Sequence, residues 1–424
     1  DNTPMIMWRI ILGLVLFFET AGAIVIGWVK EVYVDPQFTF SFIGFEWLQP
    51  LPGWGMYFYF GVLALLAIAI TLGYKYRISI ILFTLGWLGV YLMHKTSYNN
   101  HHYLITLFVG LMCFMPLNAS LSLDAKRKPS IKSSTIFNYH WLLFIATFLI
   151  VFTYAAFAKI YPDWIKGVPL QQWLSYKTDH FLVGPLYQHK ATAIIMAWGG
   201  IIFDLLVIPA LLFKPTRKIA FALSVFFHIS NSITFQIGTF PYMMIGASVL
   251  FFSGDTLRNI FRINKETQRK LIDPTPSYKT VVSSLFILFI TIQFALPIRH
   301  YAIPGNVFWT EEGHRLSWRM MLRSKSGRSS FKIIKPDGNT VWREARKDMT
   351  PKQYRTMCTH PDMIWQYCQY LKSVYGNNCE IYVDSELSLN FRKHQPLIKK
   401  EFNMAKAEWH LFKHEEWLTK GPRW

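Results

Sequence analysis

The string from Lys95 to Leu104 places two amides and two imidazoles between apolar segments, as Lys95-Thr96-Ser97-Tyr98-Asn99-Asn100-His101-His102-Tyr103-Leu104. Such side chains are costly beside hydrocarbon unless they border a cavity, a partner or water. Histidine titrates near neutral pH and asparagine both donates and accepts hydrogen bonds, so the string suits proton chemistry on an uncharged organic ligand. Periodicity alone favours the alternative, a solvated loop.

Lys159 ends another apolar segment, in Tyr154-Ala155-Ala156-Phe157-Ala158-Lys159. One interpretation is an anchor whose ammonium group extends to the membrane interface. The other is a desolvated lysine that gives up its proton and acts as a base. The span alone favours the anchor, and both interpretations stay open.

Two further groups of residues are candidates for ligand contact. His228 and Asn231 lie near the end of an apolar run that Phe240, Met243 and Met244 follow. A buried histidine usually has its partners within the core, and these apolar residues usually serve packing, but a flexible wall of Met and Phe also suits a quinone ring. The segment from Trp309 to Arg323 is dense in arginine, which can bind a carboxylate through two parallel hydrogen bonds or line a basic rim on phospholipid headgroups.

The composition predicts a polytopic α-helical membrane protein with a soluble part. Of 424 residues, 52% are hydrophobic, 17% aromatic and only 16% charged. The net charge of +19 would suit nucleic acid, but much of the excess lies in loops between apolar runs, so no nucleic-acid partner is expected. The four cysteines show no metal-ligand spacing, no metal is expected, and a disulfide among Cys358, Cys368 and Cys379 stays open.

Apolar runs of spanning or near-spanning length predict about nine transmembrane helices in residues 1–298. The runs are Ile6–Trp28, Tyr57–Leu72, Ile78–Met93, Tyr103–Leu117, Trp141–Ala158, Ala191–Phe213, Ile219–Phe235, Tyr242–Phe252 and Val281–Leu296. Alternate loops carry 15 basic residues and the opposite loops 5. The positive-inside rule then predicts a cytoplasmic N-terminus, with the Asn-His string, Lys159 and the C-terminal part on the external face of a bacterial inner membrane.

Residues 299–424 predict a small external α+β domain. Lys335-Pro336-Asp337-Gly338-Asn339 is a hairpin signal within Phe331–Trp342, Pro351–Val374 has helical periodicity, and Glu380–Leu389 alternates like a strand.

Taken together, these strings make the chain resemble a bacterial member of the vitamin K-dependent gamma-glutamyl carboxylase family. The similarity extends from about Trp8 to about Trp417. Its closest segments are Tyr76–Ser79, Lys95–His101, Lys159 with Asp163-Trp164, Gly199-Gly200, Phe227-His228 with Asn231, Ser317-Trp318 with Met320-Met321, and His360 with Asp362-Met363.

The resemblance implies an enzyme that uses O2 to convert reduced vitamin K (the hydroquinone) into its 2,3-epoxide and couples this step to carboxylation of glutamate by CO2. It implies Lys159 as the base, with His101 and Asn100 in the same centre, so that Lys159 and His101 should line one pocket. The implied quinone-site residues are His228, Asn231, Phe240, Met244, Met320 and Met321. The implied glutamate-site residues are Trp309, His314, Ser317, Arg355 and His360, and His314 stands where the animal enzymes have tyrosine.

The expected partners are the lipid bilayer and a glutamate-containing peptide or protein. Two rival functions remain open at this point. One is quinone epoxidation without carboxylation, and the other is a non-catalytic quinone-binding membrane protein or transporter.

Overall fold

The computed structural model describes residues 1–181, 183–264 and 276–422. Its long and medium helices are α1 (Thr3–Val25), α2 (Gly55–Leu72), α3 (Tyr76–Met93), α4 (Asn100–Met112), α6 (Asn138–Ala158), α8 (Val168–Ser175), α10 (Lys190–Leu212), α11 (Arg217–Phe235), α12 (Phe240–Ala247), α13 (Gly254–Phe261), α14 (Pro276–Ile298) and α17 (Pro361–Tyr375). Shorter helices are α5 (Leu123–Arg127), α7 (Pro162–Ile165), α9 (Gly184–Tyr187), α15 (Val307–Thr310) and α16 (Pro351–Met357). The strands are β1 (Lys325–Ile334), β2 (Thr340–Arg343), β3 (Glu380–Leu389) and β4 (Gln395–Pro396).

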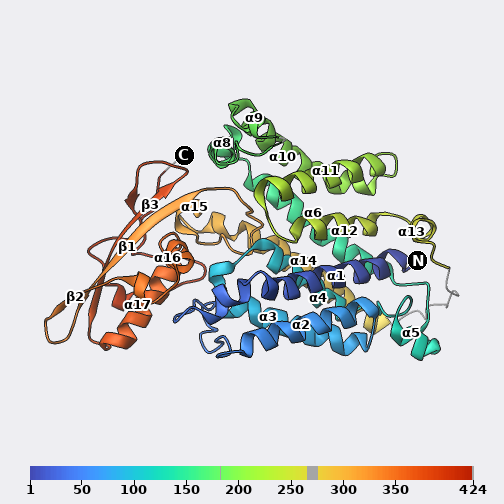
Figure 1. Ribbon diagram of the computed structural model, residues 1–424, viewed down its shortest axis with the longest axis horizontal. Helices are drawn as coiled ribbons and strands as arrows, with labels where there is room; N and C mark the ends of the chain where they lie inside the picture. The colour runs from blue at the N-terminus through green and yellow to red at the C-terminus, as the bar shows by residue number, and fades with distance from the viewer. Residues whose placement is uncertain (182, 265–275, 423–424) are drawn as a thin grey trace.

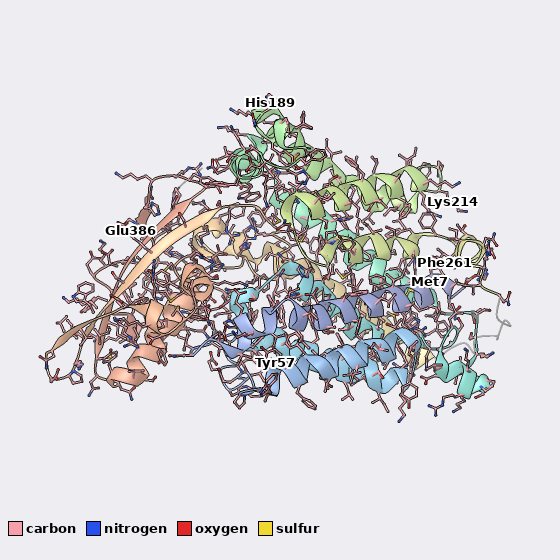
Figure 2. All side chains as sticks on the ribbon, viewed as in Figure 1. Met7, Tyr57, His189, Lys214, Phe261 and Glu386 are labelled. Atoms are coloured by element: carbon pink, nitrogen blue, oxygen red, sulfur yellow. The ribbon has the colours of Figure 1, made fainter. Side chains whose placement is uncertain are left out.

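The helices up to α14 form one bundle, and the strands with α16 and α17 form a second part at one end of it (Figure 1). The N-terminus, α5 and α13 lie at the opposite end of the bundle. Figure 2 places Lys214 and Phe261 at that same end, near Met7, whereas Glu386 lies in the sheet. Several of the basic loops therefore lie far from the C-terminal part, as the charge pattern predicts.

Seven helices of the described residues are long and apolar enough to cross a membrane. They are α1, α2, α3, α6, α10, α11 and the segment Ser277–Ala302, which contains most of α14. The protein is therefore an integral membrane protein of the expected class, although two of the nine predicted spans are shorter than predicted. Of Tyr103–Leu117, only the part up to Met112 is helical, within the 13-residue α4, and Tyr242–Phe252 lies mostly in the 8-residue α12 and a 3-10 turn. A helix rises 1.5 Å per residue, so each is too short to cross about 30 Å of hydrocarbon alone.

The C-terminal part has one antiparallel sheet in the order β2-β1-β3-β4. β1 pairs with β2 through the predicted hairpin, where Lys335 N–H donates to Asn339 O at 2.9 Å and Gly338 takes the left-handed conformation that the turn needs. β3 has the predicted bounds, and Val383 lies opposite Phe331 in the buried register with β1. The predicted α+β class is confirmed.

One predicted element of this part is wrong. Pro351–Val374 is not a single helix, because α16 ends at Met357 and α17 begins at Pro361. Proline lacks the N–H that a continuous helix needs and disfavours helical geometry in the preceding residue. His360 accordingly has an extended backbone, and the break turns its side chain toward the bundle.

Side-chain hydrogen bonds join the two parts. Arg392 donates to both oxygens of Asp163 in α7, at 2.5 and 2.7 Å, and Asn390 donates to the same carboxylate at 2.8 Å. On the other side, Gln366 donates to the backbone oxygen of Ser41 at 3.0 Å. These contacts fix the C-terminal part over the end of the bundle.

Candidate active site

A cavity of about 1000 Å³ lies between the bundle and the C-terminal part. The bundle side is supplied by the Lys95–His102 string and by residues of α1 and the 236–240 turn, and the other side by residues 311–325 and 352–360. The polar string is therefore the wall of a cavity and not the solvated loop that periodicity favoured.

Most of the charge in the cavity wall is positive. Six cationic side chains, Lys95, Arg315, Arg319, Arg323, Lys325 and Lys352, face two carboxylates, Glu19 and Glu311. A cavity wall with this excess of positive charge favours an anionic ligand.

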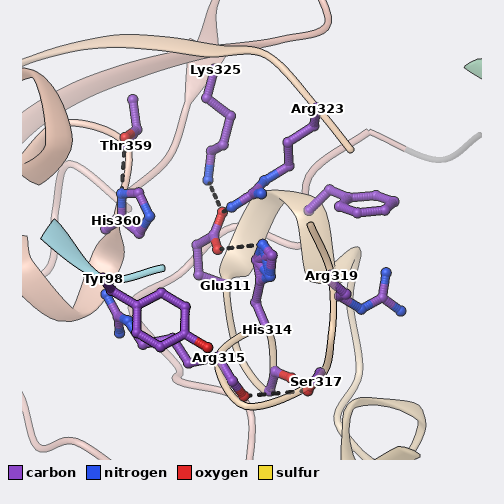
Figure 3. Close-up of polar contacts among 12 residues, drawn as sticks. Tyr98, Glu311, His314, Arg315, Ser317, Arg319, Arg323, Lys325, Thr359 and His360 are labelled. Atoms are coloured by element: carbon purple, nitrogen blue, oxygen red, sulfur yellow. Dashed lines mark hydrogen bonds and ion pairs between the residues drawn. The ribbon is translucent and has the colours of Figure 1, made fainter. Parts of the chain in front are cut away.

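Glu311 is the centre of one ion cluster (Figure 3). Its Oε1 accepts from Lys325 Nζ at 2.7 Å and from Arg323 Nε at 3.1 Å, and His314 Nε2 lies 3.6 Å from Oε2. Burial alone would raise the pKa of Glu311, but Arg323, His314 and Lys325 together hold this pKa well below its ordinary value. Burial lowers the pKa of His314 well below its ordinary value, although the Glu311 carboxylate opposes this shift.

Asp362 is the centre of a second cluster, in which Lys95 and Arg315 belong to the cavity wall and Asp362 lies behind them. Its Oδ2 lies 2.5 Å from Lys95 Nζ and 2.7 Å from Arg315 Nη1, and all three groups are largely buried. Burial would raise the pKa of Asp362, but Arg315 and Lys95 hold it far below its usual range. Because Lys95 precedes α4 and Asp362 begins α17, the cluster joins the two parts of the molecule at the cavity.

This geometry predicts that Asp362→Ala destabilises the protein by about 3–5 kcal/mol, because it leaves two buried cations without their partner. The measurement is thermal unfolding of the detergent-solubilised protein. Asp179→Ala is the control, because Asp179 is exposed, and it should leave the unfolding temperature unchanged. Equal unfolding temperatures for Asp362→Ala and the parent protein would contradict a stabilising role for this cluster.

Arg319 is the cation of the cavity that lacks a carboxylate partner among the described residues. Its Nη2 lies 2.6 Å from His300 Nε2, and its guanidinium lies 5.0 Å from the centre of the Phe308 ring. Burial lowers the pKa of Arg319 to about 10, so it remains charged at neutral pH. It is therefore available to an anionic ligand.

The backbone around these residues is unusual. Glu311, Leu316, Trp318 and Met321 all have positive φ angles, between 46° and 61°, although none is glycine. Each such residue costs on the order of 1–3 kcal/mol and persists where surrounding contacts hold it, commonly at functional sites. Here Tyr98 accepts from Leu316 N–H at 2.8 Å and donates to Asn100 at 3.1 Å, which fixes the segment against the Asn-His string.

The structure brings seven of the expected site residues to the cavity wall: Asn100, His101, Phe240, His314, Met320, Met321 and His360. His101 lies beside Phe240, with ring centres 6.0 Å apart. Met320 and Met321 extend this apolar side, whereas His314 and His360 lie with the charged groups.

The remaining expected residues are outside the cavity wall. His228 packs among Phe203, Phe227 and Phe240, Asn231 donates to Phe227 O, and Met244 is buried. Trp309 lies in the hydrophobic core, and its indole N–H donates a hydrogen bond to the Thr419 hydroxyl. The Ser317 hydroxyl donates to the Gly313 backbone oxygen. Arg355 is exposed on α16.

Lys159 is not in the wall that contains His101, which contradicts the expectation of one shared pocket. Its Nζ donates to Asp204 Oδ2 of α10 at 2.5 Å and to Ala155 O at 3.1 Å. Lys159 is 8% exposed and paired with a carboxylate of the bundle, so it is not an anchor that extends to the interface. Sequence reasoning gave no role to Asp204, Glu311, Lys325 or Asp362, because the ion pairs that define their roles follow no spacing rule.

A second, apolar groove of about 460 Å³ lies between α6 and α14. It extends from Leu149 and Phe294 to Ala158, the residue before Lys159, and to Arg319. Arg319 therefore borders both the groove and the charged cavity.

Comparison with known families agrees with this two-part organisation. Residues 1–255 match the HTTM domain, and residues 278–423 match the lumenal domain of vitamin K-dependent gamma-carboxylase. The chain belongs to the gamma-carboxylase family. The second match begins inside α14, so it includes the helix that leads from the bundle into the C-terminal part. No solved structure matches the chain.

The C-terminal part is thus the region that matches the lumenal domain of that family. The charged cavity therefore lies where this domain meets the membrane bundle.

Proposed function

We propose that this protein converts a reduced quinone of the vitamin K type into its 2,3-epoxide with O2 and uses that reaction to carboxylate glutamate with CO2. One O2 oxygen enters the epoxide, the other leaves as water, and the γ-carbon of glutamate exchanges a proton for CO2. The observation that carries the proposal is the basic cavity with one apolar side, placed between the two parts that match the family.

The cavity suits the difficulty of this chemistry. A γ-C–H of glutamate is too weak an acid for any side-chain base at neutral pH, so the strong base must come from oxygenation of the quinone. Such a base survives only where water is kept out, and the cavity lies under a folded domain at the membrane edge. Phe240, Met320 and Met321 form the side suited to a quinone ring.

We assign the substrate carboxylate to Arg319. This guanidinium has two edges for parallel hydrogen bonds and no carboxylate partner among the described residues. Arg323 and Lys325 already bind Glu311, and Arg315 already binds Asp362. Asn100 fixes the Arg319 backbone by donating to its carbonyl oxygen at 3.2 Å.

Lys159 is the proposed base that removes the first proton from the quinol. We propose that Asp204 accepts the proton of Lys159 and so leaves a free amine. This transfer does not change the net charge of the buried pair. Lys159 borders neither the cavity nor the groove, so the proposal requires the quinol ring held at Phe240, Met320 and Met321 to come within reach of the amine when the quinol binds.

Carboxylate binding is predicted to weaken at alkaline pH. Burial lowers the pKa of both Lys95 and Lys325 to about 8, so both are charged at pH 7 and largely neutral at pH 9. A lysine is positive below its pKa, so raising the pH removes positive charge from the cavity wall. The dissociation constant of a glutamyl peptide should therefore rise about tenfold between these pH values, which corresponds to about 1.4 kcal/mol. Titration calorimetry on the solubilised protein measures the change. Lys325→Arg should reduce it, because arginine stays charged, and tighter binding at pH 9 would contradict the assignment.

We also propose an orientation with the N-terminus inside and the C-terminal domain outside the inner membrane. Exposed Asn339→Cys should react with a membrane-impermeant thiol reagent in intact cells, because the basic loops favour the cytoplasmic side. Exposed Lys126→Cys in α5 is the matched control and should react only after permeabilisation. The reverse pattern would place the cavity on the cytoplasmic side.

The first test of the proposed function is epoxide formation by the purified protein, given reduced vitamin K and oxygen. Epoxide produced at a rate proportional to protein concentration supports an enzyme. Binding of the quinol without turnover would instead support a non-catalytic quinone-binding protein.

A further inference from the structure

Glu19, His101 and His102 form a cluster of metal-ligand side chains that the proposed reaction does not require. Glu19 comes from α1 and the two histidines from the first turn of α4. Each offers one ligand atom, and these three atoms lie within 4.8 Å of one another. All three residues border the large cavity.

Two members of the cluster are already positioned. His102 Nε2 lies 3.0 Å from Glu19 Oε1, and Glu19 Oε2 accepts a hydrogen bond from Thr239. Aromatic rings surround the imidazole of His102, with Trp87 at 5.3 Å and Trp28 at 6.4 Å between ring centres. A carboxylate held by a hydroxyl group and an imidazole held by packing are typical of pre-oriented ligands.

His101 is the member that a simple Glu–His pair leaves unexplained. Its ring stands 4.5 Å from that of His102, yet it has no side-chain hydrogen bond to any residue that the structure describes. A histidine that faces a cavity with an unused ring nitrogen, next to a second histidine and a carboxylate, completes a set of two nitrogen donors and one oxygen donor.

We propose that Glu19, His101 and His102 bind one divalent first-row transition-metal ion. Two imidazoles and one carboxylate suit Zn2+, Fe2+, Co2+ and Mn2+, and three protein ligands leave positions open toward the cavity. An ion there would act as a Lewis acid toward an oxygen atom of a bound ligand. This site goes beyond the proposed function, and the two proposals are tested independently.

The test is equilibrium dialysis of the purified full-length protein, first stripped with a chelator, against Zn2+ or Co2+. We expect one tightly bound ion per chain and, with Co2+, a visible absorption band that reports nitrogen and oxygen ligands. Glu19→Gln and His101→Asn should each raise the dissociation constant at least tenfold. His101→Asn is the informative variant, because His101 makes no hydrogen bond whose loss would unfold the protein.

His360→Gln is the matched control, since His360 borders the same cavity but lies outside the cluster. It should bind the ion as the parent does. The absence of stoichiometric binding, or equal binding by the parent and by folded His101→Asn, would overturn the proposal. Because the readout is metal content, a failure here is separate from a failure to form epoxide or to carboxylate.

Discussion

Substitution of Lys159 by alanine is expected to lower epoxide formation by roughly 10²- to 10⁴-fold, the loss typical of removing a general base. The physical reason is that Lys159 is paired with a buried carboxylate, Asp204, which can hold its proton while the amine acts as the base. The rate is measured with purified protein, reduced vitamin K and oxygen, at equal amounts of folded protein.

This variant needs a stability control, because it leaves Asp204 buried without its partner. The double variant Lys159→Met with Asp204→Asn removes both charges and keeps similar volumes. We expect it to be well folded by thermal unfolding and as inactive as Lys159→Ala. If the folded double variant forms epoxide at the parent rate, Lys159 is not the base and the ion pair serves only the architecture of α6 and α10.

Substitution of Arg319 by glutamine is expected to raise the KM for a glutamyl peptide by about 10- to 100-fold, because a hydrogen bond to a charged group is worth about 1.5–3 kcal/mol. The KM for the quinol should change much less. Arg328→Gln is the matched control, because Arg328 lies on β1 with a largely exposed side chain. It should leave both KM values unchanged.

An unchanged KM for the peptide in Arg319→Gln would show that the substrate carboxylate binds elsewhere in the cavity. The next candidates would be Arg323 and Lys325, whose partner Glu311 would then have to move away when substrate binds. A larger effect on the quinol than on the peptide would likewise contradict the assignment.

Local patterns predicted the elements of the fold well. The hairpin around Gly338 and the strand Glu380–Leu389 depend on turn chemistry and alternation within a few residues, and both are confirmed. Hydropathy located the membrane helices, but composition alone did not show that the fourth run ends after 13 residues of helix. The break at Pro361 was readable in principle, because proline interrupts helical hydrogen bonding.

From residue types alone, the site was predictable only where its residues are contiguous, and the family resemblance added Phe240, His314, Met320, Met321 and His360. The string from Lys95 to His102 borders the cavity as one wall, so its composition was a sufficient signal. Lys159 with Asp204, and Lys95 with Asp362, are pairs that helix packing brings together across long separations in the chain. No spacing rule links such residues, so sequence reasoning singled out Lys159, missed its partner and wrongly expected it to share a pocket with His101.

The most direct test of the central claim is incorporation of labelled CO2 into a glutamyl peptide by the purified protein, with epoxide measured in the same reaction. The account predicts label at the γ-carbon of glutamate that depends on reduced vitamin K and oxygen and is lost in Lys159→Ala. Epoxide formation with no labelled peptide, over a range of glutamyl sequences, would contradict coupled carboxylation. The protein would then be a quinone epoxidase that does not carboxylate glutamate.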